Sequence, residues 1–268
     1  NIFNMKNYLV IGNTIEHSLS PQLHNYWIKE NNIKAIYDKK KLNINELKDL
    51  IIKMKEKKIN GINVTVPFKN EIINYLDELS IEAQKTKSVN TIFLKNNRIV
   101  GHNTDIEGFE RAIEDTKFNV SNKKILILGA GGVVPSIIFV LNKLNASQIM
   151  LCNRTKEKAE NLNKSYSNLK IVNWGEIPDF DMVINATSLG LNLEDNINLD
   201  FSKIGKGKFF YDVIYNPQET NFLKTAKKLG NLTENGKKMF LYQAASAFKI
   251  WHGVEPKINK EVKKILDQ

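Results

Sequence analysis

The chain of 268 residues is long enough to form two domains, each with its own hydrophobic core. Hydrophobic residues make up 42% of it and charged residues 25%, and no apolar run approaches the roughly 20 residues that a membrane span needs. The net charge of +10 comes from dispersed lysines without an arginine-rich stripe, so we expect no nucleic-acid partner and no membrane association. The single cysteine, Cys152, cannot form an internal disulfide, and with no visible signal peptide it favours a cytoplasmic location.

The first predicted strand, residues 6–12, leads into a loop that contains Ser18 and Ser20. The pair Ser20-Pro21 is typical of a helix start, where serine caps the helix and proline occupies its first turn. Both serines follow the carboxyl end of a strand, which is where open α/β sheets bind ligands. Helix capping alone would also explain Ser20, but it would not explain Ser18. A second strand is predicted at residues 35–42, followed by a helix with Leu47, Leu50, Ile51 and Met54 on its apolar face.

The segment 61–66 alternates in polarity, which predicts a strand with Val66 on its apolar face and Thr65 on its polar face. We expect Pro67 to end this strand and to begin a helix, with Lys69 in the first turn. The positive end of the helix dipole would favour the neutral amine there, which makes Lys69 a candidate acid or base. The alternative is an ordinary solvated surface lysine.

Residues 89–94 and 98–102 are predicted to form a strand pair joined at Asn96-Asn97, with Asn90 opening the first strand. The second strand then leads into a helix that begins near Asp105, for which a plain N-cap is the alternative role. All the candidate polar side chains so far fall where a strand ends and a loop or helix begins. They therefore predict one site for a ligand with many hydroxyl groups, built from Ser18, Ser20, Thr65, Lys69, Asn90 and Asp105.

A buried strand at residues 125–128 is followed by a glycine cluster and then by an apolar helical pattern. This order places backbone N–H groups and a helix N-terminus around one point, which suits a pyrophosphate; an ordinary tight turn is the alternative. Val134 stands at the third glycine position of the dinucleotide fingerprint and is expected to hold helix and strand further apart. The candidate cofactor residues of this turn are Gly129, Ala130, Gly131, Gly132 and Val133.

The next predicted strand, residues 148–152, ends in Asn153, Arg154 and Thr155. Sheets that bind NAD usually carry an acidic residue at this position, which bonds the ribose 2′-hydroxyl. Here an arginine that could fork onto a 2′-phosphate replaces it, so we expect NADP rather than NAD. Further strands are predicted at residues 169–172, 181–186 and 209–213, and Thr220 is expected to cap a helix that reaches Leu229.

Nine segments resemble, in order and spacing, the shikimate dehydrogenase family over roughly residues 8–256: HSLSPQLHN, GINVTVPFKN, SVNTI, GHNTDIEGF, ILILGAGGVV, NRTKEKAENL, DMVINATSLG, YDVIYNPQET and MFLYQAASAF. The resemblance implies that Lys69 and Asp105 form the catalytic pair and that Ser18 and Ser20 hold a substrate carboxylate. It further implies substrate contacts from Thr65, Asn90, Tyr215 and Gln243, and cofactor contacts from Thr187 and Gly236. Pro135 stands where many relatives carry a basic residue, so cofactor affinity is expected to depend more heavily on Arg154.

The resemblance implies NADPH-dependent reduction of 3-dehydroshikimate to shikimate, a small-molecule substrate, without a metal. We expect an α/β fold with an N-terminal α/β substrate domain (mainly parallel sheet; residues 1–104 and 239–268) and a Rossmann-type NADP-binding domain (residues 105–238). The C-terminal helices are expected to return to the first domain. The alternatives are a quinate/shikimate dehydrogenase that accepts NAD, a non-catalytic ligand-sensing module, and a folate-type dehydrogenase/cyclohydrolase, which would lack the S-x-S-P and N-T-D segments. A homodimer is left open.

Overall fold

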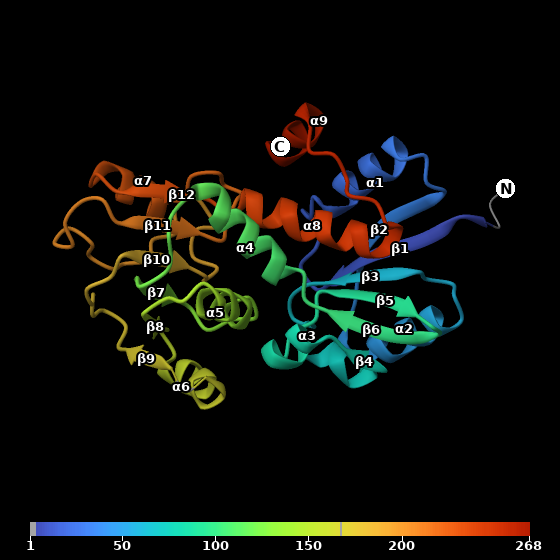
Figure 1. Cartoon of the computed structure of the whole chain (residues 1–268), viewed down its shortest axis with the longest axis horizontal. Coiled ribbons are helices and arrows are strands. Elements are labelled where there is room, and N and C mark those ends of the chain that lie inside the picture. Colours follow the sequence, from blue (N-terminus) through green and yellow to red (C-terminus); the bar gives the residue numbers. More distant parts are fainter. Residues whose placement is uncertain (1–3, 167) are drawn as a thin grey trace. The chain divides into compact units, whose positions relative to one another are not determined.

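The computed structural model describes residues 4–166 and 168–268, which divide into two compact α/β units (Figure 1). Unit 1 runs through Gly108 and resumes at Leu241–Gln268, and unit 2 is Phe109–Phe240. Residues 1–3, which the predicted first domain includes, lie outside the described ranges. Two helices span the unit boundaries, α4 (Asp105–Thr116) and α8 (Lys237–His252).

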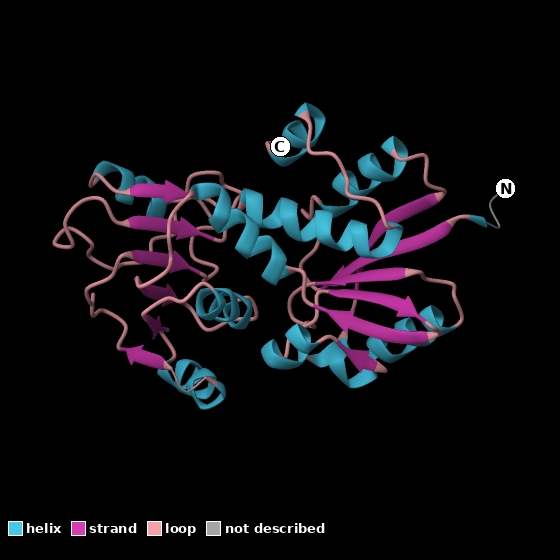
Figure 2. Ribbon diagram, viewed as in Figure 1, coloured by secondary structure: helices cyan, strands magenta, loops and turns pink. Residues whose placement is uncertain are grey.

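The sheet of unit 1 has the strand order β2-β1-β3-β5-β6-β4 (Figure 2). The pairings of β1 with β2 and β3, and of β4 with β6, are parallel, whereas β5 runs antiparallel to β3 and β6. The predicted strand pair is confirmed as β5 and β6, and its turn residues Asn96 and Asn97 both have positive φ, as the hairpin turn requires. The elements are β1 (Lys6–Gly12), α1 (Ser20–Glu30), β2 (Ala35–Lys41), η2 (Ile44–Glu46), α2 (Leu47–Lys55), β3 (Gly61–Val64), η3 (Glu71–Tyr75), β4 (Glu78–Leu79), α3 (Ile81–Thr86), β5 (Thr91–Lys95), β6 (Arg98–His102) and α9 (Lys260–Leu266).

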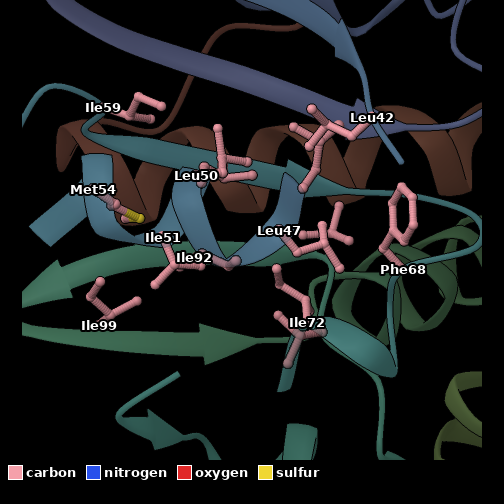
Figure 3. Packing of buried hydrophobic residues seen from close by; sticks show 14 of the residues in the cluster. Leu42, Leu47, Leu50, Ile51, Met54, Ile59, Phe68, Ile72, Ile92 and Ile99 are labelled. Carbon is pink, nitrogen blue, oxygen red and sulfur yellow. The ribbon is translucent and has the colours of Figure 1, made fainter. Parts of the chain in front are cut away.

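The hydrophobic core of unit 1 lies between helix α2 and the sheet (Figure 3). The helix presents residues at the i, i+3, i+4, i+7 spacing, and each buried side chain of this size contributes about 1.5–3 kcal/mol. Phe68, from the turn after β3, belongs to the same core, and so does Ile92 of β5. The core therefore fixes the turn that carries Lys69 and the strand that follows Asn90. Its members from α2 are Leu47, Leu50, Ile51 and Met54.

The C-terminal segment packs on the rest of unit 1 through hydrogen bonds of indole N–H groups. Trp251 Nε1 donates to the carbonyl oxygen of Ile92 over 3.0 Å, and Trp27 Nε1 donates to the carbonyl oxygen of Lys257 over 3.0 Å. The predicted return of the C-terminal helices to the first part of the chain is confirmed.

The sheet of unit 2 has the order β9-β8-β7-β10-β11-β12, and its neighbouring strands pair in parallel. This is the doubly wound order of dinucleotide-binding sheets, with the topological switch between β7 and β10. Helix α6 packs on β8 and β9, and α7 packs on β11 and β12. The predicted α/β fold class is confirmed. The elements are β7 (Lys124–Leu128), α5 (Val134–Lys143), β8 (Gln148–Cys152), α6 (Lys156–Ser165), β9 (Leu169–Val172), β10 (Met182–Asn185), β11 (Phe209–Asp212), α7 (Asn221–Lys228) and β12 (Leu232–Glu234). None of the described helices is long and apolar enough to cross a membrane.

Candidate functional site

Lys69 and Asp105 form an ion pair in unit 1, with Lys69 Nζ 2.7 Å from Asp105 Oδ2. Their side chains are 17% and 10% exposed, so the pair is largely shielded from water but still accessible. Asp105 is the first residue of α4, and Lys69 lies in the turn after β3, where its carbonyl oxygen accepts the Val89 N–H over 2.8 Å. A partly buried, hydrogen-bonded pair of this kind holds an ammonium group in a defined position.

The prediction that Pro67 begins a helix is wrong. The Val66-Pro67 peptide bond is cis, the Phe68 N–H donates to the carbonyl oxygen of Thr65 in a turn, and the next element is the 3₁₀ helix η3, which begins at Glu71. Lys69 therefore does not lie in the first turn of a helix. Its ammonium group is positioned by the contact with Asp105 rather than by a helix dipole. The prediction for Val66 is wrong too, because the strand ends at Val64 and Val66 is 61% exposed.

Asn90 holds the first turn of α4 through both ends of its side-chain amide. Its Oδ1 accepts the Thr104 N–H over 2.7 Å, and its Nδ2 donates to Thr104 Oγ1 over 2.9 Å and to Asp105 Oδ1 over 3.3 Å. Asn103 Oδ1 accepts the Asp105 N–H over 3.0 Å. The carboxylate of Asp105 therefore bonds Lys69 and Asn90, which differs from the alternative of a plain helix cap.

A buried polar network continues from Asn90 across the sheet. The Tyr37 hydroxyl donates to Asn63 Oδ1 over 2.7 Å, and Asn63 Nδ2 donates to the Asn90 carbonyl oxygen and to Thr91 Oγ1, both over 3.1 Å. Burial raises the pKa of the Tyr37 phenol, so it stays a hydrogen-bond donor. Tyr37, Asn63 and Thr91 are not among the site residues predicted from the sequence. The sequence does contain a signal for this network, because polar residues occupy inward positions of predicted strands; Asn63 and Thr91, for example, are paired in the sheet.

Ser18 and Ser20 lie together at the start of α1. Ser20 is the first helical residue, and its N–H donates to Ser18 Oγ over 3.3 Å. The prediction that Ser20 caps the helix is therefore wrong, because the chain turns into the helix one residue earlier, at Leu19, and no side chain bonds the first turn from that position. Ser20 is buried and lies close to the Tyr37 hydroxyl, next to the polar network of Asn90.

Thr65 and Gln243 are the other predicted substrate residues of unit 1. Thr65 lies just beyond β3, where its N–H donates to the carbonyl oxygen of Ile11 over 2.9 Å, and Gln243 is half-buried on α8. Tyr215 belongs to unit 2, where its ring lies 4.8 Å from that of Phe240. Burial raises the pKa of Tyr215 to about 12, so its hydroxyl stays protonated.

The glycine turn after β7 has the shape that an anion requires. Gly129 has a φ of +112°, and an added Cβ would lie 2.9 Å from the carbonyl oxygen of Ala186, so only glycine fits. At Gly131 and Gly132, by contrast, an added Cβ would meet no described atom within 4 Å. The open space therefore lies just before α5, which begins at Val134, and the N-terminus of a helix is a place that suits a pyrophosphate.

A second buried polar cluster lies at the carboxyl ends of β10 and β11. The Thr187 N–H and hydroxyl both donate to Asn185 Oδ1, over 3.1 and 2.6 Å, and Asn185 Nδ2 donates to Asp212 Oδ1 over 3.1 Å. Asp212 is fully buried and also accepts the Thr220 hydroxyl over 2.6 Å and the Ile214 N–H over 3.0 Å. Asp212, which is not among the site residues predicted from the sequence, ends β11 in register with Asn185 at the end of β10.

Thr220 was predicted as a helix cap, and this is confirmed, because its side chain accepts from the Leu223 N–H at the start of α7. Gly236, the last predicted cofactor residue, precedes α8. An added Cβ there would overlap the carbonyl oxygen of Val213, so the close approach of two backbone segments requires glycine.

The tip of β8 is basic and exposed. Asn153 Nδ2 donates to the carbonyl oxygen of Thr155 over 2.9 Å, which closes the turn around the exposed side chain of Arg154. Thr155 occupies the N-cap position of α6. Cys152 is buried in β8, and burial raises the pKa of its thiol to about 11, as expected for a packed strand residue rather than a nucleophile. Among the described residues no three His, Cys, Asp or Glu side chains are grouped closely enough to hold a metal ion.

Nearly the whole chain matches known protein families and known proteins. Residues 10–92 match the shikimate dehydrogenase substrate binding domain, and residues 111–213 match the shikimate / quinate 5-dehydrogenase domain. The chain is 58% identical to shikimate dehydrogenase (NADP(+)) of Pelagibacter ubique, over 98% of this chain and 99% of that protein.

Solved structures of shikimate dehydrogenases are also similar to this chain. Shikimate dehydrogenase of Aquifex aeolicus is 38% identical, has a TM-score of 0.89 and covers 98% of each chain. A shikimate dehydrogenase in complex with NADP+ is also 38% identical, with a TM-score of 0.88 over 98% of this chain and 94% of that one. On these matches, the chain belongs to the shikimate dehydrogenase family.

Proposed function

We propose that this protein catalyses the reversible reduction of 3-dehydroshikimate to shikimate with NADPH. Its relatives over nearly its full length bear the name shikimate dehydrogenase (NADP(+)). The observation that carries the proposal is the ion pair of Lys69 and Asp105, because the reaction needs a positioned proton donor.

Reduction of a ring ketone adds a hydride to the carbonyl carbon and a proton to its oxygen. The nicotinamide supplies the hydride when the cofactor is bound. Lys69 donates the proton to the developing alkoxide, or steadies its negative charge by a hydrogen bond. An ammonium group has three N–H donors, so one can stay with Asp105 while another reaches the substrate oxygen. Asp105 holds the lysine in place through this hydrogen bond.

The remaining predicted side chains of the site supply hydrogen bonds to the substrate. Ser18 and Ser20 suit its carboxylate, because their hydroxyls lie at the start of α1 with backbone N–H groups beside them. Thr65, Asn90 and Gln243 suit the ring hydroxyls, and the neutral phenol of Tyr215 is a further donor. We assign the predicted substrate domain, residues 1–104 and 239–268, to unit 1.

NADP is assigned to unit 2 as the predicted domain of residues 105–238. The turn Gly129–Val133 holds the pyrophosphate, because its glycines leave room in front of the backbone amides. Arg154, with Asn153 and Thr155 shaping the turn, binds the 2′-phosphate. Thr187 and Gly236 complete the predicted set at the carboxyl side of the same sheet.

The test is to measure absorbance at the NADPH band with shikimate or quinate, each combined with NADP or NAD. Shikimate with NADP should give the highest kcat/KM. Faster turnover of quinate with NAD would instead favour the quinate/shikimate alternative, which the matched family description also covers. A folded protein that binds NADP but turns over neither acid would favour the ligand-sensing module.

A cytoplasmic location and a homodimer remain predictions that accompany this function. A reducing compartment suits the free, buried Cys152. Light scattering of the purified protein would determine its oligomeric state.

A further inference from the structure

The side chains of Arg154 and Trp174 meet at one edge of the sheet of unit 2. Strands β8 and β9 are parallel neighbours, and Cys152 at the end of β8 is paired with Val172 at the end of β9. Arg154 and Trp174 each lie two residues beyond this pair. The guanidinium carbon of Arg154 lies 5.5 Å from the centre of the Trp174 ring, which is within the range of a cation–π interaction.

The tryptophan is the fixed member of this pair. Its ring is half-buried and packs against the hydrophobic core of unit 2. The turn that carries it is closed on both sides, because the Glu176 N–H donates to the carbonyl oxygen of Asn173 over 3.1 Å and Asn173 Nδ2 donates to Glu176 Oε1 over 2.9 Å. Arg154 is exposed and follows a strand end, so the ring restrains the arginine rather than the reverse.

We propose that Trp174 is a positioning residue for Arg154 and that it thereby contributes to the preference for NADP over NAD. An aromatic face restrains a guanidinium without using its N–H donors and without neutralising its charge. The planar fork of Arg154 is then already oriented when a 2′-phosphate arrives, which lowers the entropic cost of a bidentate contact. This inference deepens the proposed function and rests on its assignment of the 2′-phosphate to Arg154.

The test measures the binding of 2′,5′-ADP and 5′-AMP by calorimetry, because the two probes differ only in the 2′-phosphate. The proteins are the wild type, Trp174→Leu, Trp174→Phe, Arg154→Ala and the double variant. Trp174→Leu should weaken the binding of 2′,5′-ADP about two- to fivefold more than the binding of 5′-AMP. This factor corresponds to the free energy of a cation–π contact at an exposed site. Trp174→Phe should restore much of this difference. In the Arg154→Ala background, Trp174→Leu should leave the ratio of the two affinities unchanged.

Ile177→Ala is the matched control, because Ile177 follows in the same segment and also packs half-buried against the same core. It should leave the affinity ratio as in the wild type. An equal loss of both probes in Trp174→Leu, or no loss at all, would overturn the inference and leave Arg154 as the sole determinant. If Trp174→Leu lowers the melting temperature, the double variant decides, because a loss of selectivity that persists in the Arg154→Ala background would not act through Arg154 and would overturn the inference. A wild type that binds both probes equally would instead overturn the NADP assignment itself.

Discussion

Asn90 Nδ2 donates to Asp105 Oδ1 over 3.3 Å, and the opposite oxygen of the same carboxylate accepts the ammonium group of Lys69. Because both oxygens have a partner, the carboxylate cannot rotate without breaking a hydrogen bond. Asn90 thus fixes Asp105, and Asp105 fixes Lys69, before any substrate binds. Such preorganisation of a charged donor is the largest contribution that many active sites make to catalysis.

Replacement of the proposed proton donor tests the pair directly. Lys69→Ala should lower kcat for shikimate oxidation by about 10²–10⁴ with a smaller change in KM, because it removes an interaction that strengthens in the transition state. Steady-state kinetics with NADP would measure both constants. Lys53→Ala, an exposed lysine of α2, is the control and should retain wild-type kinetics. Near-normal turnover of Lys69→Ala would remove this lysine from the mechanism.

Asn90 should matter for stability as well as for activity. Asn90→Ala leaves the N–H and hydroxyl of the fully buried Thr104 without their partner on residue 90, which should cost about 1–3 kcal/mol of unfolding free energy. It also releases Asp105, so kcat should fall together with stability. Urea unfolding and kinetics on the same variant would measure both effects. Asn74→Ala, in the exposed part of η3, should change neither, and a wild-type unfolding curve for Asn90→Ala would contradict the role of the network.

Much of this arrangement follows from local sequence patterns. Alternating polarity, the Asn96-Asn97 turn and the glycine cluster each depend on the backbone conformation of a few neighbouring residues, so the strands, the hairpin and the glycine turn could be predicted. The pairing of Lys69 with Asp105 could not be derived in this way, because 36 residues separate them; it came from the family resemblance.

The buried polar network shows why its residues could not be predicted from the sequence. Tyr37 reaches Asn63 only because β1 lies between β2 and β3 in the sheet, and Asn63 reaches Thr91 only through the register of β3 with β5. A single sequence gives neither strand order nor register. The prediction of a helix start at Pro67 was wrong for a related reason. Proline is compatible with both a helix start and a turn, and contacts made elsewhere in the chain decide between them.

The two ends of the glycine turn should respond differently to the same substitution. Gly131→Ala meets no described atom within 4 Å, so unfolding free energy should change by less than about 0.5 kcal/mol while the KM for NADPH rises several-fold, because the methyl group occupies the phosphate surface. Gly129→Ala should destabilise the fold by more than about 1 kcal/mol through its positive φ and its approach to Ala186. Thermal unfolding and NADPH titration separate the cases. Unchanged NADPH affinity in Gly131→Ala would place the pyrophosphate elsewhere.

His24 should make the protein sensitive to acid. It is buried, stacks on Tyr37 with ring centres 4.3 Å apart, and neither ring nitrogen has a partner among the described residues. Burial, together with the charge of His252, lowers the pKa of His24 to about 3. Below its ordinary value of about 6.5 the unfolded chain takes up a proton that the folded chain refuses, so the stability present above that pH is lost as the pH falls.

His24→Phe keeps the stacked ring and removes the proton site. Between pH 7 and pH 5 the wild type should therefore lose about 2 kcal/mol more unfolding free energy than this variant. Urea unfolding at the two pH values would measure the difference. His17→Gln, which changes an exposed loop histidine, should behave like the wild type, and parallel losses in wild type and His24→Phe would contradict the burial of a neutral ring.

Asp212 should have the opposite pH dependence. Burial raises the pKa of its carboxyl to about 6, against the hydrogen bonds from Thr220, the Ile214 N–H and Asn185. Between about pH 4 and pH 6 the folded chain holds a proton that the unfolded chain releases, so its contribution to stability is present at low pH and is lost as the pH rises through 6. Asp212→Asn has the same shape and can keep the Asn185 and Ile214 donors on its oxygen, but it does not titrate. The stability of the variant relative to the wild type should therefore rise by about 2 kcal/mol from pH 4 to pH 7 in urea unfolding. A difference that stays constant with pH would mean that the hydrogen bonds outweigh burial and that Asp212 is ionised throughout this range.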